Sequence, residues 1–235
     1  MNRYSILHRF SILHRPLPMV EIINDKSDSR CLEIYKLRHD VVIDQCKMKI
    51  NESNIFNSSS GKIICDVHDV SDATTHYAIR NPNTGKIVSA IRTIDANKTQ
   101  LDMENHNWFK LDPVLKQDGV VEWSRLVSDM SVRKTNAALL LYVASVNHQQ
   151  SIGINNGIFM VDSRATKLLK HYKRWTICKQ ISKEAVSCDE YELGRKSFVM
   201  LMPTGKPYSI ERAKFNTCVE VPITLASMAM KSYAV

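Results

Sequence analysis

THYAIRNPNTGKIVSAIRTI, residues 75–94, predicts a β-hairpin. Its two ends, 75–80 and 87–94, are rich in residues that favour strands, and residues 81–85 between them are a strong turn signal. A hairpin joins antiparallel strands, so the chain is expected to contain an antiparallel sheet.

Further elements are predicted on both sides of this hairpin. Apolar residues recur at helical spacing over 29–46, where Asp28 or Ser29 is available as the N-terminal cap. Residues 51–61 are polar and end in glycine, which predicts a surface loop bordering a ligand site. Further strands are predicted at 62–67, 120–127, 158–161, 191–194 and 197–202, and helices at 136–150 and 163–172. Helices interspersed with antiparallel strands indicate an α+β layered fold.

The composition is that of one globular domain. With 235 residues, 44% of them hydrophobic and 24% charged, the chain can bury a core without dividing into two units. We expect a flexible arm at 1–20, a single domain at 21–202, and a C-terminal extension at 203–235 that packs on this domain. No long apolar run occurs, which predicts a cytoplasmic protein without stable membrane insertion. The six cysteines stand singly, so neither a disulfide framework nor a metal site is predicted.

The formal net charge of +8 indicates an acidic partner. Nucleic acid, an anionic membrane surface and an acidic carrier protein would each satisfy this charge. The basic residues form no dense block with interleaved aromatic side chains, which disfavours nucleic acid. The charge alone does not choose between the other two partners.

Four groups of residues follow one another along the predicted elements. They are Leu37-Arg38, Asp66-x-x-Asp69, Ser89-Ala90-Ile91-Arg92 and Glu122-Trp123-Ser124-Arg125. In this order they resemble the pattern of the bacterial acyl-homoserine-lactone synthases and the related N-acyl amino acid synthases. The resemblance extends from about Leu32 to Trp175 and includes Trp108-Phe109 and the stretch 168–175. Each group alone is common in unrelated proteins, so the ordered combination carries the resemblance.

The resemblance implies an acetyltransferase-like (GNAT) fold and an N-acyltransferase that moves a fatty acyl group from a thioester to an amine. The implied donor is acyl carrier protein or acyl-coenzyme A, and the implied acceptor is S-adenosylmethionine, with no permanently bound cofactor. The implied product is an N-acyl-homoserine lactone, a quorum-sensing signal. Matched to the motif, the catalytic residues are Glu122, Ser124 and Arg125, and the substrate-binding residues are Arg38, Asp66, Asp69, Arg92 and Trp123.

An amine attacks a thioester only when it is neutral, because an ammonium has no free lone pair. Glu122, buried beside Trp123 with a raised pKa, would supply the required base. An ordinary ion pair of Glu122 with Arg92 or Arg125 is the alternative reading. In a regular strand Ser124 would share a face with Glu122 while Arg125 pointed away, so a β-bulge is predicted here. The resemblance also implies backbone N–H groups at this bulge that polarise the thioester carbonyl.

The arginines of the motif would form ion pairs with its carboxylates and hold the pocket in shape. A capped turn is the alternative reading for Asp66 and Asp69. Residues 137–146 and 158–161 offer apolar walls for an acyl tail and are equally suited to an ordinary core. Basic residues that could dock a carrier protein, or could simply be solvated, are Arg133, Lys134, Lys167, Lys170, Lys173 and Arg174.

Two positions depart from the pattern of the synthases. Val42 stands where they usually carry Phe, and the stretch Cys46-Lys47-Met48 lacks the aromatic residue that shapes the S-adenosylmethionine site. An amino acid acceptor is therefore a second hypothesis. A third is a basic binding module without catalysis, in which the arginines and carboxylates are only structural. The lack of a glycine-rich loop between Ser128 and Asn136 favours a carrier protein over coenzyme A as donor.

Overall fold

The computed structural model describes the central part of the chain. The described residues are 19–50, 52–133, 135, 137–164, 178–188 and 196–203. The predicted arm, except for its last two residues, and the predicted C-terminal extension, except for Pro203, lie outside them. The predicted strand at 191–194 and all but the first two residues of the predicted helix at 163–172 also lie outside. No helix within the described ranges is long and apolar enough to cross a membrane.

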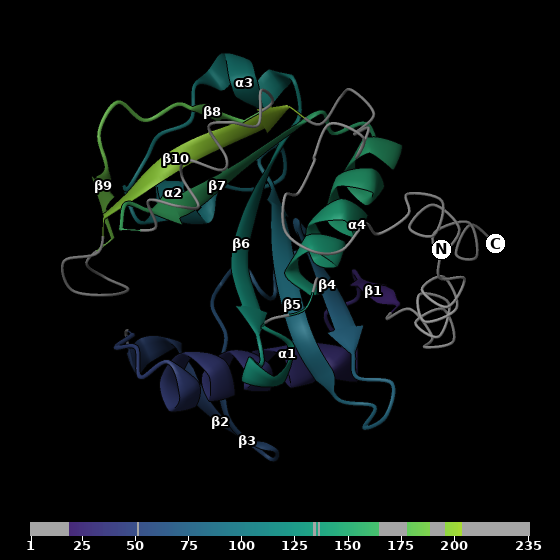
Figure 1. Ribbon diagram of the computed structural model, residues 1–235. Helices are drawn as coiled ribbons and strands as arrows, with labels where there is room; N and C mark the ends of the chain where they lie inside the picture. The colour runs from purple at the N-terminus through teal and green to yellow at the C-terminus, as the bar shows by residue number, and fades with distance from the viewer. Residues whose placement is uncertain are drawn as a thin grey trace, which may run out of the picture.

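Helices and strands are interspersed along the described chain (Figure 1). The strands are β1 (Val20–Ile23), β2 (Ile55–Ser58), β3 (Gly61–Ile64), β4 (Thr74–Arg80), β5 (Ile87–Asp95), β6 (Val120–Ser128), β7 (Asn156–Asp162), β8 (Lys179–Gln180), β9 (Val186–Ser187) and β10 (Lys196–Pro203). The α-helices are α1 (Ser29–His39), α2 (Asp102–Asn105), α3 (Pro113–Gln117) and α4 (Ala137–Ser151). Shorter helical segments are the π-helix η2 (Asp40–Gln45) and the 3-10 turns η3 (Glu52–Asn54) and η4 (Met130–Val132).

One sheet holds every described strand except β2 and β3. Its order is β1-β4-β5-β6-β7-β10-β8, and β9 also pairs with β10. All neighbours are antiparallel except β6 and β7, which are parallel. The predicted hairpin is present as β4 and β5. The predicted α+β layered fold with a mostly antiparallel sheet is confirmed.

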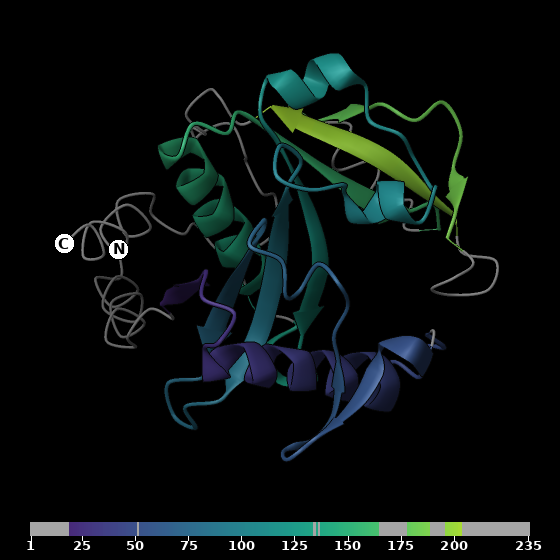
Figure 2. The same ribbon diagram turned by 180° about the vertical axis from the view of Figure 1, so that it is seen from behind.

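Helices cover the two faces of the sheet separately (Figures 1 and 2). α4 packs on the face that carries Tyr77, Ile91 and Trp123. α1 packs on the opposite face, over Ala78 and Ala90, and the segment containing α2 and α3 covers the same face further along β6, β7 and β10. We call these the α4 face and the α1 face.

The first helix continues differently from the prediction. Asp28 caps α1, and its side chain accepts a hydrogen bond from the N–H of Arg30 at 2.9 Å. Beyond His39 the helical spacing predicted up to residue 46 continues as the wider π-helix η2. Gln45 at the end of η2 donates to Asp129 at 2.8 Å, which ties this helix to the segment that follows β6.

The surface loop predicted at 51–61 is wrong in part, because β2 lies within it and forms a small hairpin with β3. The strand predicted at 62–67 is present as β3, which ends earlier, at Ile64. Ile55 pairs with Ile64 and Phe56 with Ile63, so short apolar runs on both sides of the serines pair with each other. The serines that suggested a loop supply only the turn, which Gly61 completes with a φ of 111°. β3 packs against α1.

β6 and β7 pair only along their first halves. The four pairs run from Val120–Asn156 to Trp123–Phe159. Beyond them β6 continues to Ser128 and β7 to Asp162 without pairing with each other, and the two strands diverge (Figure 1). The edge of β6 that faces β7 therefore loses its ladder partner after Trp123.

Candidate functional site

A cluster of charged side chains lies on the α1 face, where α1, the turn 66–69, β5, β6 and α2 meet. We call it the charged cluster, and its members are Arg38, Asp66, Asp69, Arg92, Asp102 and Arg125. Arg92 on β5 is fully buried at its centre. Its Nη1 donates to Asp66 at 2.6 Å and to Asp69 at 2.9 Å, and its Nε donates to the Ser124 hydroxyl at 2.9 Å. Its Nη2 lies 3.2 Å from Asp102. Three carboxylates therefore surround one guanidinium.

Arg38 extends from α1 into the same cluster. Its Nη1 donates to Asp69 at 2.6 Å, and its guanidinium lies over the Tyr35 ring, 5.4 Å from the ring centroid. Only 2% of Arg38 is exposed, and its Nε and Nη2 have no hydrogen-bond partner in the described part of the chain.

Asp66 and Asp69 both cap their own turn and form ion pairs with arginines, so the two interpretations made from the sequence hold together. Asp66 accepts from the N–H groups of His68 and Asp69, and Asp69 accepts from the N–H of Asp66 at 3.0 Å, so the turn is capped by its own side chains. The same carboxylates bind the arginines. Burial would raise the pKa of Asp66, but Arg92 and Arg125 outweigh it and hold this pKa well below its usual range. Arg38 and Arg92 do the same for the pKa of Asp69.

The β-bulge predicted on β6 is present. Between the pairs Arg92–Ser124 and Ala90–Val127, two residues of β6 oppose one residue of β5. Arg125, the first of the two, has a φ of 55°, a left-handed conformation that re-aims its side chain. Its Nη2 consequently reaches Asp66 at 2.9 Å and Asp102 at 3.2 Å.

Asp102, the first residue of α2, is the member of the cluster that the sequence analysis missed. It is buried and contacts both Arg92 and Arg125 through one carboxylate oxygen. Its other oxygen lies 3.5 Å from Nε2 of His106. Charge balance was the one signal for it, since the buried Arg38 and Arg92 and the partly buried Arg125 need more than the two aspartates of the motif.

Glu122 stands beside the cluster without joining it. It is buried, and its Oε2 accepts a hydrogen bond from the N–H of Met103 at 3.3 Å. Among the described residues it forms no ion pair, so the alternative reading of Glu122 as a partner of Arg92 or Arg125 is wrong, and it is Asp102 that pairs with both arginines. Burial, and then the charge of Asp102, raise the pKa of Glu122 to about 8.

Trp123 points to the opposite face of the sheet, because side chains alternate along a strand. Its indole Nε1 donates to Ser145 on α4 at 3.0 Å, and its ring packs edge-to-face on Tyr142 and Phe159. The expectation that Glu122 is buried beside the Trp123 side chain is therefore wrong. Trp123 lies instead between α4 and β7, the two segments predicted as walls for an acyl tail.

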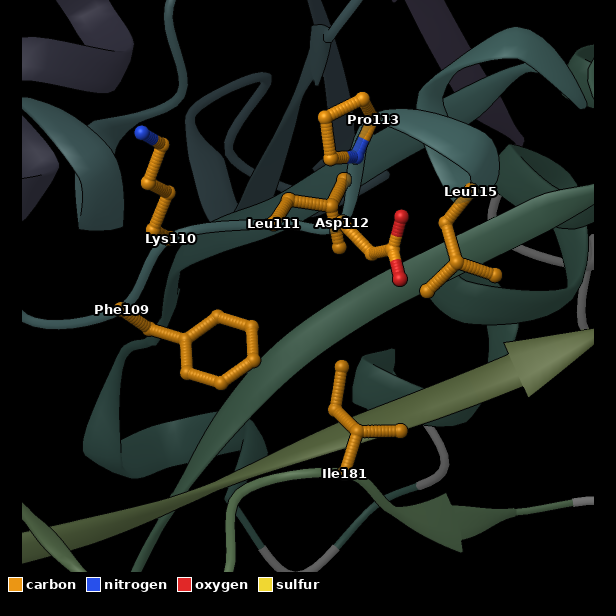
Figure 3. A pocket seen from close by; sticks show the side chains of 7 residues that line it. All are labelled: Phe109, Lys110, Leu111, Asp112, Pro113, Leu115 and Ile181. Atoms are coloured by element: carbon orange, nitrogen blue, oxygen red, sulfur yellow. The ribbon is translucent and has the colours of Figure 1, made fainter.

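Two shallow depressions lie elsewhere on the surface. One, of about 490 Å³, is lined by Phe109, Leu111, Leu115 and Ile181 among others, and its apolar side chains come from opposite sides (Figure 3). The other, of about 880 Å³, lies near Gly119 and Gly153. No residue of the charged cluster lines either one.

Within the described ranges, one group of side chains comes close enough together to share a metal ion. It consists of His39 at the end of α1 and Asp40 and Asp44 on η2, outside the cluster. Lys36 Nζ already contacts Asp40 at 3.1 Å. Nothing in this arrangement points to a bound metal.

The proposed carrier-docking residues are mostly outside the described ranges. Of the six, only Arg133 is described, and its guanidinium donates to the carbonyl of Ser128 and to the Cys46 thiol. The described residues contain as many aspartates and glutamates as lysines and arginines. The net positive charge of the chain therefore belongs entirely to its other segments.

Comparisons with known proteins agree on the fold. No family model matches the chain, and none of the curated proteins matches it. The solved structure of BjaI, a coenzyme-A-dependent acyl-homoserine lactone synthase, aligns with a TM-score of 0.59 and 14% identity, covering 92% of this chain and 100% of BjaI. FeeM, an N-acyl amino acid synthase from uncultured soil microbes, aligns with a TM-score of 0.57 and 10% identity, covering 82% of this chain and 93% of FeeM.

A candidate N-acetyltransferase from Lactobacillus plantarum aligns with a TM-score of 0.51 and 13% identity, covering 79% of this chain and 99% of that protein. At these identities the likeness concerns the fold. The chain thus has the acetyltransferase-like fold shared by acyl-homoserine lactone synthases and N-acyl amino acid synthases.

Proposed function

We propose that this protein is an N-acyltransferase that moves a fatty acyl group from a thioester to the amine of a small molecule. The observation that carries the proposal is Glu122, a buried carboxyl with a raised pKa beside the point where β6 and β7 diverge. A base whose pKa approaches that of an amine suits proton removal from an ammonium. Arg92 and Arg125 already form ion pairs with aspartates, so Glu122 has no arginine partner among the described residues.

The proposed reaction forms one bond and breaks another. The neutral amine nitrogen attacks the thioester carbonyl, a C–N bond forms, and the C–S bond breaks. Glu122 accepts the proton that leaves nitrogen, and the departing thiolate takes up a proton, so the products are an amide and a thiol. Backbone N–H groups of β6 near the bulge would stabilise the negative charge on the carbonyl oxygen.

The acyl donor would enter where the β6–β7 ladder ends. Its apolar tail would extend towards the α4 face, among Trp123, Tyr142 and Phe159, because the α1 face at this point is occupied by charged groups. Acyl carrier protein is the proposed donor and acyl-coenzyme A the alternative. Both would act as substrates, with no resident cofactor, and we place the protein in the cytoplasm, where such donors are made.

The proposed acceptor is S-adenosylmethionine. After its amine is acylated, its own carboxylate would attack the γ-carbon, so that a C–O bond forms, the C–S bond of the sulfonium breaks and methylthioadenosine leaves, which would give an N-acyl-homoserine lactone. A free amino acid is the second candidate, and Val42 favours it. Val42 packs against the core beneath α1 where the synthases carry a ring, so it offers no aromatic surface to an adenosyl group. Both acceptors carry a carboxylate, with which the unpartnered donors of Arg38 would pair.

The test is mass spectrometry of lipophilic products from a bacterial host that expresses the wild type or Glu122→Gln. Acyl-homoserine lactones made only with the wild type would support the first acceptor, and N-acyl amino acids would support the second. We expect Glu122→Gln to reduce product about a hundredfold or more.

The control is Glu104→Gln, which removes another buried carboxyl of the α1 face. Glu104 accepts from Lys116 and from the N–H of Leu111 and lies outside the charged cluster. It should lower stability without abolishing product. No product from a folded wild type with donors present would contradict acyl transfer and favour a binding module.

A further inference from the structure

Asp102 belongs to no group of the motif, yet it contacts two arginines of the charged cluster. It lies on a four-residue helix between β5 and β6, and 3% of it is exposed. One of its oxygens lies 3.2 Å from Arg92 and 3.2 Å from Arg125. It thereby joins two arginines that come from neighbouring strands.

Asp102 is also connected to Glu122 through the backbone. Met103 follows it directly, and the Met103 N–H donates to Oε2 of Glu122 at 3.3 Å. The position of Asp102 therefore determines where this donor lies. The same helix turn thus contacts both the arginines and the proposed base.

We propose that Asp102 is a positioning residue for acyl transfer, which holds Arg92 and Arg125 away from Glu122 so that Glu122 stays unpaired and able to accept a proton. This inference rests on the proposed function. Glu122 and Ser124 share the α1 face with both arginines, and Arg92 already donates to Ser124. Without a carboxylate at position 102, both guanidinium groups would lose an anionic partner. Glu122, whose pKa both arginines already lower, is the carboxyl on this face that would replace it. A carboxylate paired with arginine is a weaker base.

The charges around these residues fix the direction of the expected effect. Glu122 faces Asp102 from α2, Arg92 from β5 and Arg125 from its own strand, and the pKa of Glu122 is raised by burial and by Asp102 against the two arginines. Removal of the Asp102 charge must therefore lower the pKa of Glu122. Asp102 itself faces Arg125, Arg92, His106, Asp66 and His68.

The first experiment measures the kcat of wild type and Asp102→Asn as a function of pH. Octanoyl carrier protein is the donor, and S-adenosylmethionine or an amino acid mixture is the acceptor. In Asp102→Asn we expect the maximal kcat to fall about tenfold and the acid limb of the profile to move to lower pH by about one unit. Since the acceptor is the same in both proteins, its own ionisation does not affect the difference.

Two matched variants distinguish the effect of the Asp102 charge on Glu122 from a general loss of activity through destabilisation. Asp102→Glu keeps the negative charge, so the acid limb of its kcat profile should lie at the same pH as in the wild type even if kcat falls. Glu104→Gln removes a neighbouring carboxyl that binds Lys116 and should also leave the limb unchanged. If Asp102→Asn loses activity while its limb stays in place, Asp102 is only structural and the inference is wrong.

A second measurement needs no substrate. The carboxyl band of Glu122, identified in infrared spectra by its absence in Glu122→Gln, is titrated in wild type, Asp102→Asn and Asp102→Glu. We expect its midpoint to move to lower pH in Asp102→Asn only. An unmoved midpoint overturns the inference, whereas a moved midpoint in a protein without acyl transfer supports the contact and contradicts the proposed function.

Discussion

Neighbouring carboxyl groups in this protein have pKa values that differ in opposite directions from their ordinary values. Burial, and then the charge of Asp102, raise the pKa of Glu122 to about 8, while Asp66 and Asp69 of the charged cluster keep their negative charges because arginines neutralise them. The difference lies in the partners of each carboxyl, since all of them are largely buried. Such divergence between neighbouring carboxyls is typical of sites that move protons.

A first prediction concerns the stability of Glu122→Gln. The pKa of Glu122 is raised in the folded state, so its contribution to stability is present below its ordinary value of 4.5 and is lost as the pH rises to about 8. Each pH unit in this window costs the wild type about 1.4 kcal/mol. The free energy of unfolding of Glu122→Gln, relative to wild type, should therefore increase between about pH 5 and pH 8, as measured by urea denaturation.

The control for this prediction is again Glu104→Gln. The pKa of Glu104 is lowered, with burial opposed by Lys116, so its contribution is lost only in acid. Its difference from wild type should stay level between about pH 6 and pH 8. A difference for Glu122→Gln that is equally level would show that Glu122 does not hold its proton in the folded state.

A second prediction concerns Gly157 on β7. A Cβ at this position would lie 1.7 Å from Cζ3 of Trp123, because the indole ring lies against the glycine backbone. Gly157→Ala must displace Trp123 and break its bond to Ser145, which should cost about 1–3 kcal/mol in thermal or urea unfolding. The cost should be much smaller in a Trp123→Leu background. Equal costs in both backgrounds would contradict the contact.

At the level of elements, the bulge on β6 allows residues 122, 124 and 125 to share one site. Without it Arg125 would lie opposite Ile91 and enter the apolar layer beneath α4. The extra residue instead turns Arg125 towards Asp66 and Asp102. The same strand parts from β7 after Trp123, so the bulge and the proposed donor entrance lie side by side.

Deletion of Leu126 tests this role of the bulge. With one residue fewer, β6 can pair regularly with β5, and Arg125 then faces the apolar core without its aspartates. We expect a loss of several kcal/mol of unfolding free energy and no measurable transfer. Deletion of Asn83 in the exposed β4–β5 turn is the control and should be tolerated far better. A stable Leu126 deletion with wild-type turnover would refute the argument.

The elements that could be predicted were those with a local signal. β4, β5, β6, α1 and α4 each carry a period or a turn that the sequence displays, and the bulge followed from the need to bring Arg125 to the face of Glu122. β3 was predicted, as the first part of a strand at 62–67, but its partner β2 was missed because four residues are too few for a period to stand out. α2 was missed for the same reason, and with it Asp102, whose role depends on contacts between segments that are distant in sequence.

At the scale of the whole molecule, charge is divided unevenly along the chain. The described residues are balanced in charge, so the excess of +8 lies in the other segments. One of these, residues 165–177, contains Lys167, Lys170, Lys173 and Arg174 and no acidic residue. An acidic carrier protein would be attracted to such a segment, and the attraction would weaken with salt.

The last prediction compares two sets of three lysines. Replacing Lys167, Lys170 and Lys173 by Gln should raise KM for octanoyl carrier protein about tenfold at low salt and reduce its salt dependence, because complementary charge mainly affects encounter. The control replaces the exposed Lys179, Lys183 and Lys196 by Gln, which removes the same amount of positive charge. This control should leave KM nearly unchanged. An equal rise in KM for octanoyl-coenzyme A would instead assign the lysines to binding of the coenzyme's phosphates. Lysines that contact only a carrier protein would leave KM for octanoyl-coenzyme A unchanged.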